Sequence, residues 1–106
     1  MNTQYIIILV TAKDKKEAGK IARGLLEAKL IACANIIEDV RSLFWWQGKI
    51  DMSQEVLLVL KTKKILFKKV STKVKSLHSY QTPEIIALAL VAGSKDYLDW
   101  ISSSCH

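Results

Sequence analysis

The sequence predicts an α+β fold, a ferredoxin-like βαββαβ sandwich with a long hairpin between its second and third strands and a short C-terminal helix. Two observations predict it. Segments of strand character and of helical periodicity follow one another in that order, without repeats or linkers. The length, 106 residues with 50% hydrophobic composition, suits one core and therefore a single domain spanning residues 1–106. Right-handed crossovers then place both main helices on one face of an antiparallel sheet.

The first strand and the first helix are predicted between residues 5 and 29. Residues 5–10 form a nearly continuous β-branched run, which is typical of a central strand buried on both faces. Asp14 followed by Glu17 resembles a capping box at a helix start. An amphipathic helix over about residues 15–29 follows, because apolar residues recur at spacings of three and four: Ala18, Ile21, Ala22, Leu25 and Leu26.

A long hairpin is predicted next. Residues 32–46 alternate like a strand, and Glu38 with Asp39 in its middle indicates a bulge or bend. Gln47 and Gly48 separate this segment from a second β-rich one that ends at residues 55–60, so a tight turn with glycine at positive φ is expected. Arms of ten or more residues exceed the ~5–6 of an average strand, so they extend beyond one small sheet.

Three aromatic residues lie on this arm: Phe44, Trp45 and Trp46. Exposed aromatic residues on a projecting arm are a liability unless a neighbour covers them, so we predict that they form a subunit interface. The alternative is that they fold back onto their own sheet. The strands are apolar on both sides while both helices cover one face, so another subunit is expected to cover the other.

The second half of the chain predicts a helix, a strand and a last helix. A helix over about residues 65–77 is indicated by apolar residues at helical spacing: Phe67, Val70, Val74 and Leu77. Pro83 opens an apolar run at residues 84–91, the fourth strand, where its missing N–H does no harm. Ser94 can cap a short last helix that presents Tyr97, Leu98, Trp100 and Ile101.

Positive charge is concentrated in one stretch. The formal net charge is +6, and no acidic residue interrupts the lysines at positions 61, 63, 64, 68, 69, 73 and 75. Such a stretch is either an electrostatic footprint for nucleic acid or anionic lipid, or a solvated helix face. Helical spacing, the lack of arginine and a single aromatic residue favour the solvated face.

The location is predicted to be cytoplasmic. The longest apolar run, residues 85–92, is far shorter than the ~20 residues of a membrane-spanning helix, so no membrane partner is expected. Residues 1–5 have no basic region typical of a secretory signal. The two cysteines, Cys33 and Cys105, form no CxxC pair or disulfide framework, which suits a reducing compartment.

The sequence indicates a binding or assembly protein and not an enzyme. It contains only two histidines, no paired-carboxylate motif, and neither a Walker loop nor a GxGxxG segment. An RNA-binding domain of the same topology needs stacking aromatics on its two central strands. Those strands offer only aliphatic residues apart from Tyr5, so no nucleic-acid partner is expected.

Several short segments, in order and at matching spacing, resemble the CutA divalent-cation tolerance family along nearly the whole chain. They are Leu-Val-Thr-Ala at 9–12, Cys-Ala-Asn at 33–35, Trp-Gln-Gly-Lys at 46–49, residues 55–62, His-Ser-Tyr-Gln-Thr-Pro-Glu-Ile-Ile-Ala-Leu at 78–88, and Tyr-Leu-Asp-Trp at 97–100. The resemblance implies a cytoplasmic homotrimer of ferredoxin-like subunits with edge-to-edge strand pairing, an architecture shared with PII signalling proteins. It also implies tolerance to copper and other divalent metals, and no established reaction.

The resemblance also implies candidate metal ligands. Some bacterial members resemble copper binders through a histidine pair before the tyrosine and a cysteine near the end of the first strand. Here His78 is the retained histidine, Leu77 and Val10 stand at the other two positions, and Cys33 remains. We therefore expect His78 and Cys33 to bind Cu2+ or another divalent cation. The alternatives are a surface histidine and an inert buried thiol.

A tight metal site needs three or four ligands, so the others would come from a neighbouring subunit or from the tail residues Cys105 and His106. Further polar residues are expected at an intersubunit or ligand cleft: Lys49, Glu55, Lys61, Tyr80 and Glu84. Glu84 would pair with Lys61, and Glu55 and Lys49 suit an ion pair as well as a ligand pocket. The main prediction is a trimeric, copper-binding tolerance protein. The alternative is a PII-like signalling or scaffold trimer that binds a small ligand or a partner protein at those clefts.

Overall fold

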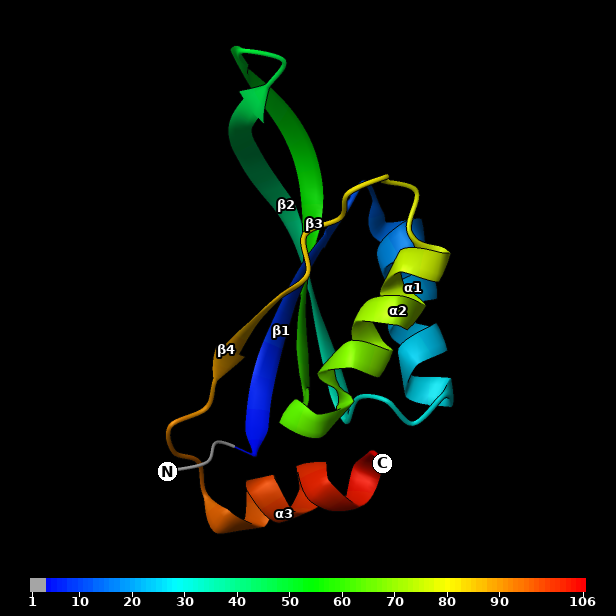
Figure 1. The fold of residues 1–106 in the computed structure, drawn as a ribbon, viewed down its shortest axis with the longest axis vertical. Coiled ribbons are helices and arrows are strands. Elements are labelled where there is room, and N and C mark those ends of the chain that lie inside the picture. The colour runs from blue at the N-terminus through cyan, green and yellow to red at the C-terminus, as the bar shows by residue number, and fades with distance from the viewer. Residues whose placement is uncertain (1–3) are drawn as a thin grey trace.

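The computed structural model of the protein describes residues 4–106, which form one four-stranded antiparallel sheet and three α-helices (Figure 1). The elements are β1 Tyr5–Ala12, α1 Lys15–Glu27, β2 Cys33–Trp46, β3 Lys49–Lys63, the 3-10 turn η1 Lys64–Leu66, α2 Phe67–Leu77, β4 Ile86–Ala89 and α3 Lys95–Ser104. The strand order is β2-β3-β1-β4. The predicted ferredoxin-like α+β fold is therefore confirmed. Residues 1–3, included in the prediction about a signal segment, lie outside the described residues.

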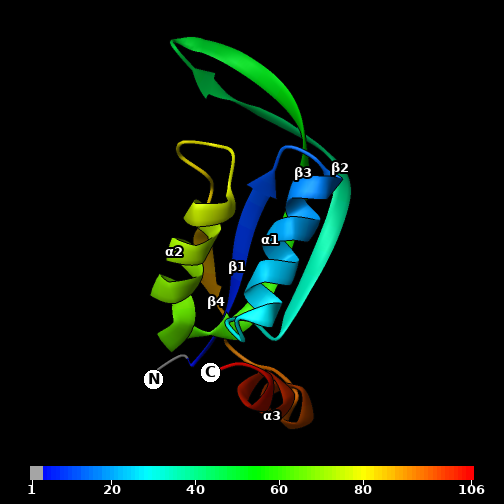
Figure 2. The same ribbon diagram turned by 90° about the vertical axis from the view of Figure 1, so that its right-hand side faces the viewer.

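Helices α1 and α2 lie side by side over one face of the sheet and enclose the core (Figure 2). Alternate residues of the two central strands point into that layer and are buried: Ile6, Ile8, Val10 and Ala12 of β1, and Val56, Leu58 and Leu60 of β3. The intervening residues of β1 are only half-buried. The prediction that this strand is buried on both faces is wrong within one chain, because α1 and α2 cover a single face.

Helix α1 begins and ends with identifiable caps. Asp14 Oδ1 accepts the backbone N–H of Glu17 at 2.8 Å, as the capping-box prediction required. At the other end, the N–H of Leu30 bonds to Leu25 O and the N–H of Lys29 bonds to Leu26 O. Lys29 adopts a φ of 62°, so the chain leaves the helix in a Schellman-type turn. The helix therefore ends at Glu27, two residues before the predicted end.

The hairpin follows its prediction closely. Gln47 and Gly48 adopt φ angles of 51° and 77°, as a two-residue type I′ turn requires. The register between β2 and β3 shifts between Ile37 and Val40, which is the predicted bulge. Beyond Val56 the two strands pair only with each other in the described structure, and they project away from the sheet (Figure 1).

We call this projecting ribbon, residues 40–55, the arm. Its aromatic residues do not fold back onto the sheet of their own chain. Phe44 is 39% exposed, Trp45 is 74% exposed and Trp46 is 59% exposed. The alternative interpretation of these residues is therefore wrong for the single chain.

The last elements depart from prediction in detail. Strand β4 has four residues instead of eight; among the described strands it pairs with β1 alone, and all four are exposed. Ser94 lies at the N-cap of α3, as predicted, but its side chain makes no capping hydrogen bond. Ile101 of α3 is fully buried, and the rings of Tyr97 and Trp100 pack against each other at 5.3 Å.

Among the described residues, no helix has the length and apolar character needed to cross a membrane.

Candidate functional site

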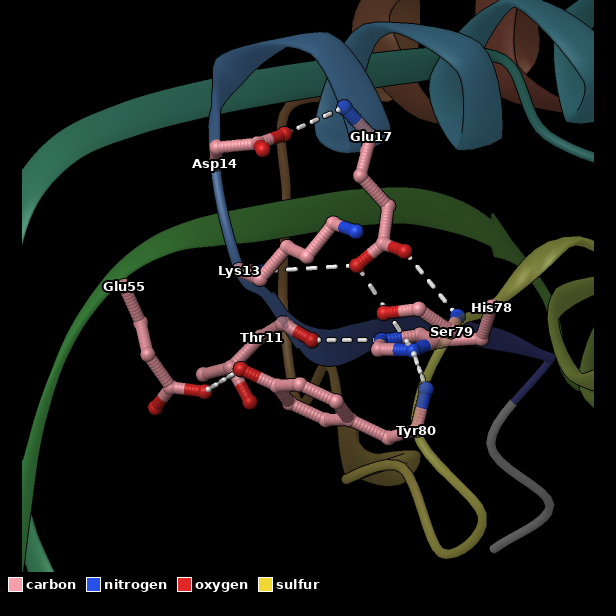
Figure 3. Close-up of polar contacts among 8 residues, drawn as sticks. All are labelled: Thr11, Lys13, Asp14, Glu17, Glu55, His78, Ser79 and Tyr80. Carbon is pink, nitrogen blue, oxygen red and sulfur yellow. Dashed lines mark hydrogen bonds and ion pairs between the residues drawn. The ribbon is translucent and has the colours of Figure 1, made fainter.

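The loop that follows α2 is anchored on the first turn of α1 by Glu17 (Figure 3). The carboxylate of Glu17 is 8% exposed and accepts the backbone N–H of Ser79 at 2.9 Å and that of Lys13 at 3.2 Å. Burial alone would raise the pKa of Glu17, but the hydrogen bonds from Ser79 and Lys13 outweigh it and hold the pKa below its ordinary value. Glu17 is thus an ionised, hydrogen-bonded anchor between two elements distant in sequence.

The ring of His78 is buried at the same place, between the loop that follows α2 and the end of β1. Its side chain is fully buried, with Nε2 2.7 Å from the carbonyl oxygen of Thr11 and Nδ1 3.0 Å from the backbone nitrogen of Tyr80. A carbonyl can only accept and an amide N–H can only donate, so the neutral ring carries its proton on Nε2 and accepts at Nδ1. Both ring nitrogens therefore have partners within the chain.

Tyr80 joins this loop to the base of the arm. Its hydroxyl donates to Glu55 Oε2 at 2.8 Å, and its ring lies 4.7 Å from that of His78 (Figure 3). Burial, followed by the hydrogen bond to Glu55 and the charge of that carboxylate, raises the pKa of Tyr80 to about 12. Glu55 itself is only 8% exposed. We call the connected residues Glu17, His78, Ser79, Tyr80 and Glu55 the loop anchor.

The other predicted cleft residues are not brought together within one chain. Lys49 lies at the tip of the arm, and Lys61 lies twelve residues along β3, a separation of about 40 Å for an extended strand. The Nζ of Lys61 lies 5.6 Å from the ring centre of Tyr97. Within residues 4–106, the lysines in ion pairs are Lys15 and Lys95. Within one chain, therefore, Lys61 forms no ion pair with Glu84, and Lys49 forms none with an acidic residue; ion pairs between subunits stay a prediction.

Comparison with known proteins identifies the family. The family model described as CutA1 divalent ion tolerance protein matches residues 6–104. The chain belongs to the CutA divalent-cation tolerance family. The divalent-cation tolerance protein CutA of Archaeoglobus fulgidus is 44% identical over 97 residues, covering 92% of this chain and 94% of the relative. The CutA protein of Thermus thermophilus is 41% identical over 95 residues, covering 90% of this chain and 92% of the relative.

Solved CutA structures share the whole architecture. The Thermus thermophilus protein superposes with a TM-score of 0.95 at 38% identity, covering 96% of this chain and 99% of that one. The protein described as the periplasmic divalent cation tolerance protein CutA from Archaeoglobus fulgidus gives a TM-score of 0.92 at 43% identity, covering 94% and 97%. CutA1 from Oryza sativa gives 0.95 at 35%, covering 98% and 95%.

The name of the family refers to divalent cations, but the described residues of one chain do not fit a single-chain metal site. Cys33 pairs with Lys61, which faces Ile7 of β1, whereas His78 bonds to Thr11, four residues further along β1. Four strand residues span about 13 Å, and ligand atoms lie within about 2.0–2.3 Å of a shared ion. The described residues contain no group of three His, Cys, Asp or Glu side chains that could hold a metal.

Of the two candidate ligands in the tail, Cys105 is buried and His106 is held through its backbone. The thiol of Cys105 is fully buried, 3.6 Å from Thr62 Oγ1, and it donates to the carbonyl oxygen of Ile101 at 3.3 Å. The backbone N–H of His106 bonds to Lys29 O at 3.0 Å. The tail is thus fixed against the end of α1, and Cys105 contributes to packing.

The central residue of the loop anchor was missed as a functional position. Glu17 was predicted only as part of a helix cap. Its carboxylate does accept a local N–H, from Lys13, but its second oxygen binds Ser79, 62 residues away in sequence. The available signal was an acidic residue within the apolar stripe of an amphipathic helix, beside Ala18 and Ile21, where burial requires a polar partner.

Proposed function

We propose that this member of the CutA family works as a non-catalytic homotrimer with one CutA-like domain per subunit, and that it binds divalent cations, copper among them, between subunits. The observation that carries the proposal is exposed apolar surface, in two places, that one chain cannot cover. It comprises the arm and the face of the sheet opposite α1 and α2. The number three comes from the family resemblance.

The arm supplies the strongest support. Leu43 lies opposite Met52 and Trp45 lies opposite Ile50, so these four apolar side chains share one face of the ribbon. Each is at least 58% exposed in the single chain. An exposed apolar ribbon of this kind is an aggregation hazard unless another chain buries it. A second copy that packs along the arm would remove it from water.

The uncovered sheet face gives independent support. Ile86 and Leu88 of β4 are 52% and 54% exposed, and they lie opposite Leu9 and Ile7 of β1. The helical layer lies on the other side and cannot reach them (Figure 2). An oligomer that closes on this face would leave α1 and α2 at its outer surface.

The cation is proposed to bind at the clefts between subunits, because one chain brings too few ligands together. Glu55 is a carboxylate of the loop anchor, Glu84 follows Tyr80 by four residues in sequence, and Cys33 is a half-buried free thiol in register with Lys61 and Ile7. His78 would bind a metal only after giving up one of its two hydrogen bonds. Its first role within the chain is to hold Tyr80 in place.

The experiment measures the molar mass of the assembly and then its binding of metal ions. Light scattering should give about three times the chain mass of 11.9 kDa, and a monomer would overturn the proposal. Trp45→Glu should break the assembly, because it places a charge on the apolar face of the arm. An unchanged mass in that variant would place the interface elsewhere.

Metal binding is then measured on the intact assembly. Metal-free, reduced protein is titrated calorimetrically with Cu(II) and with Zn(II), beside Cys33→Ala and His78→Ala. Saturable heat at a fixed ratio per assembly, lost in Trp45→Glu, supports a site between subunits. The absence of saturable heat from an intact trimer would contradict cation binding.

A second candidate function is a PII-like signalling or scaffold trimer that binds a small ligand or a partner protein at the same clefts. The hydrogen bond between Tyr80 and Glu55 favours it, since it places a fixed polar pair beside the uncovered face without a metal. A trimer with no saturable metal heat would select this candidate.

Cytoplasmic location is part of the proposal. Both Cys33 and Cys105 are free thiols, which suits a reducing compartment. Cell fractionation of the native protein tests it, and recovery from an oxidising compartment would contradict it.

A further inference from the structure

The outer surface of α2 carries positive charge that no acidic residue of the described chain neutralises. Lys68, Lys69 and Lys75 are exposed, Lys73 is half-buried, and no acidic residue occurs between Glu55 and Glu84. The ion pairs formed by lysines in residues 4–106 involve Lys15 and Lys95 instead. Unpaired lysines in a row produce a local positive potential that attracts an anionic surface.

A large apolar side chain lies among these lysines. Ile65, in the turn that leads into α2, is 83% exposed, although the neighbouring Leu66 is buried. Residues at spacings of three and four from Ile65 share its face of the helix. A groove along this face is lined by Leu30, from the segment after α1, and by six residues of η1 and α2: Ile65, Lys68, Lys69, Thr72, Lys73 and Ser76. We call these six residues the basic ridge.

The basic ridge belongs to α2 and the turn before it, and α2 lies on the opposite side of the sheet from the uncovered face (Figure 2). It therefore does not compete with the proposed subunit interface. We propose that the basic ridge docks the protein peripherally on an anionic lipid bilayer, with its lysines against the acidic headgroups and Ile65 inserted among them. This inference is independent of the proposed trimer and of metal binding.

The side-chain chemistry favours a lipid surface over other polyanions. Lysine is a hydrated point charge that suits diffuse attraction to headgroups, whereas arginine suits the paired, planar contacts of nucleic-acid recognition. The ridge contains no arginine and no aromatic ring for base stacking. An exposed isoleucine surrounded by lysines matches the combination of electrostatic attraction and shallow apolar insertion that holds amphipathic helices at a bilayer.

The test is co-sedimentation of the full chain with phosphatidylcholine vesicles, with and without phosphatidylglycerol, at low and raised salt. The ridge variant is Lys68→Gln with Lys69→Gln. The matched control is Lys15→Gln with Lys16→Gln, which removes the same charge from exposed positions at the start of α1. Ile65→Ser tests insertion, and circular dichroism confirms that each variant folds.

The wild type should sediment with the phosphatidylglycerol vesicles and not with phosphatidylcholine alone. Each neutralised ridge lysine should weaken binding about fivefold, so the ridge variant should lose about 25-fold and the control much less. Ile65→Ser should weaken binding about tenfold. The loss should be larger at raised salt than at low salt, because screening weakens the electrostatic attraction and leaves apolar insertion as the main source of binding. Any of four results would overturn the proposal: no sedimentation with anionic vesicles, equal losses in the two double variants, no effect of Ile65→Ser, or ridge-dependent binding to duplex DNA in place of vesicles.

Discussion

Strand β3 passes through two regions that carry apolar side chains on the same side of the strand and have opposite environments. In its base, residues 56–63, Val56, Leu58 and Leu60 are almost completely buried between β1 and the helices. In the arm, Ile50 is 66% exposed and Met52 is 58% exposed. The residues named in the two regions are all even-numbered, so they lie on one side of the strand, although Leu57 and Val59 make the base apolar on its other side as well. The comparison shows that periodicity fixes which side chains share a face, while the cover over that face depends on elements, or chains, elsewhere.

The loop anchor stands at the boundary between these regions. Val56 is the last residue of β3 that pairs with β1, and Glu55 is the first that does not. Tyr80 bonds to Glu55 at this boundary. The loop after α2 therefore fixes the point at which the arm leaves the sheet, and with it the direction in which the arm projects.

The largest predicted effect contrasts the two regions directly. In a Trp45→Glu background, which should be monomeric, Leu58→Ala should lower the free energy of unfolding by about 2–5 kcal/mol, because it leaves a cavity at a fully buried position. Ile50→Ala, the matched truncation on the same strand, should change it by less than about 0.5 kcal/mol. Urea unfolding measures both. Equal losses would mean that the arm is packed within its own chain.

Contacts between adjacent residues could be predicted from the sequence more completely than contacts between distant residues. The turn at Gln47 and Gly48, the bulge before Val40 and the Asp14 cap were all predicted, because each depends on the backbone preferences of a few adjacent residues. Strand β4 was predicted too long, because an apolar run does not show that a partner strand is available along its full length.

The candidate site was predicted only in part for the same reason. His78, Tyr80 and Glu55 were named as site residues, and the structure connects them in one hydrogen-bonded group. The acceptor of the His78 ring is a backbone carbonyl, that of Thr11, and a backbone group has no residue-type signal. Cys33 and His78 share a chemistry that suits metals, but residue type carries no information on the distance between them.

An intermediate effect is predicted for the anchor itself. Glu17→Ala should lower the free energy of unfolding by about 1–3 kcal/mol, because it leaves the N–H groups of Lys13 and Ser79 without their acceptor in a part-buried site. It should also increase hydrogen exchange at Ser79 and Tyr80 more than in the core of β3. Uniform exchange increases would indicate general destabilisation instead of a released loop.

The charge of Glu17 predicts how the stability of the protein depends on pH in the acid range. The folded-state pKa of Glu17 is lowered from its ordinary value of 4.5, so its ionised form stabilises the fold above that pH. The stabilisation should disappear as the pH falls through the lowered folded-state pKa. Glu17→Gln, which cannot ionise, should show a smaller loss of stability over the same acid range. Identical pH profiles for the two proteins would contradict a role for the charge.

The smallest predicted effect concerns the contact at the boundary. Tyr80→Phe removes the hydroxyl that bonds to Glu55 and should lower the free energy of unfolding by about 0.5–1.5 kcal/mol near neutral pH. The folded-state pKa of Tyr80 is raised from 10.0 to about 12, so the stabilisation is complete below pH 10 and is lost as the pH rises towards 12. The difference in tyrosinate absorbance between wild type and Tyr80→Phe reports this titration. A midpoint near 10 in the folded protein would show that Tyr80 is not held by Glu55, and the arm would then leave the sheet without this restraint.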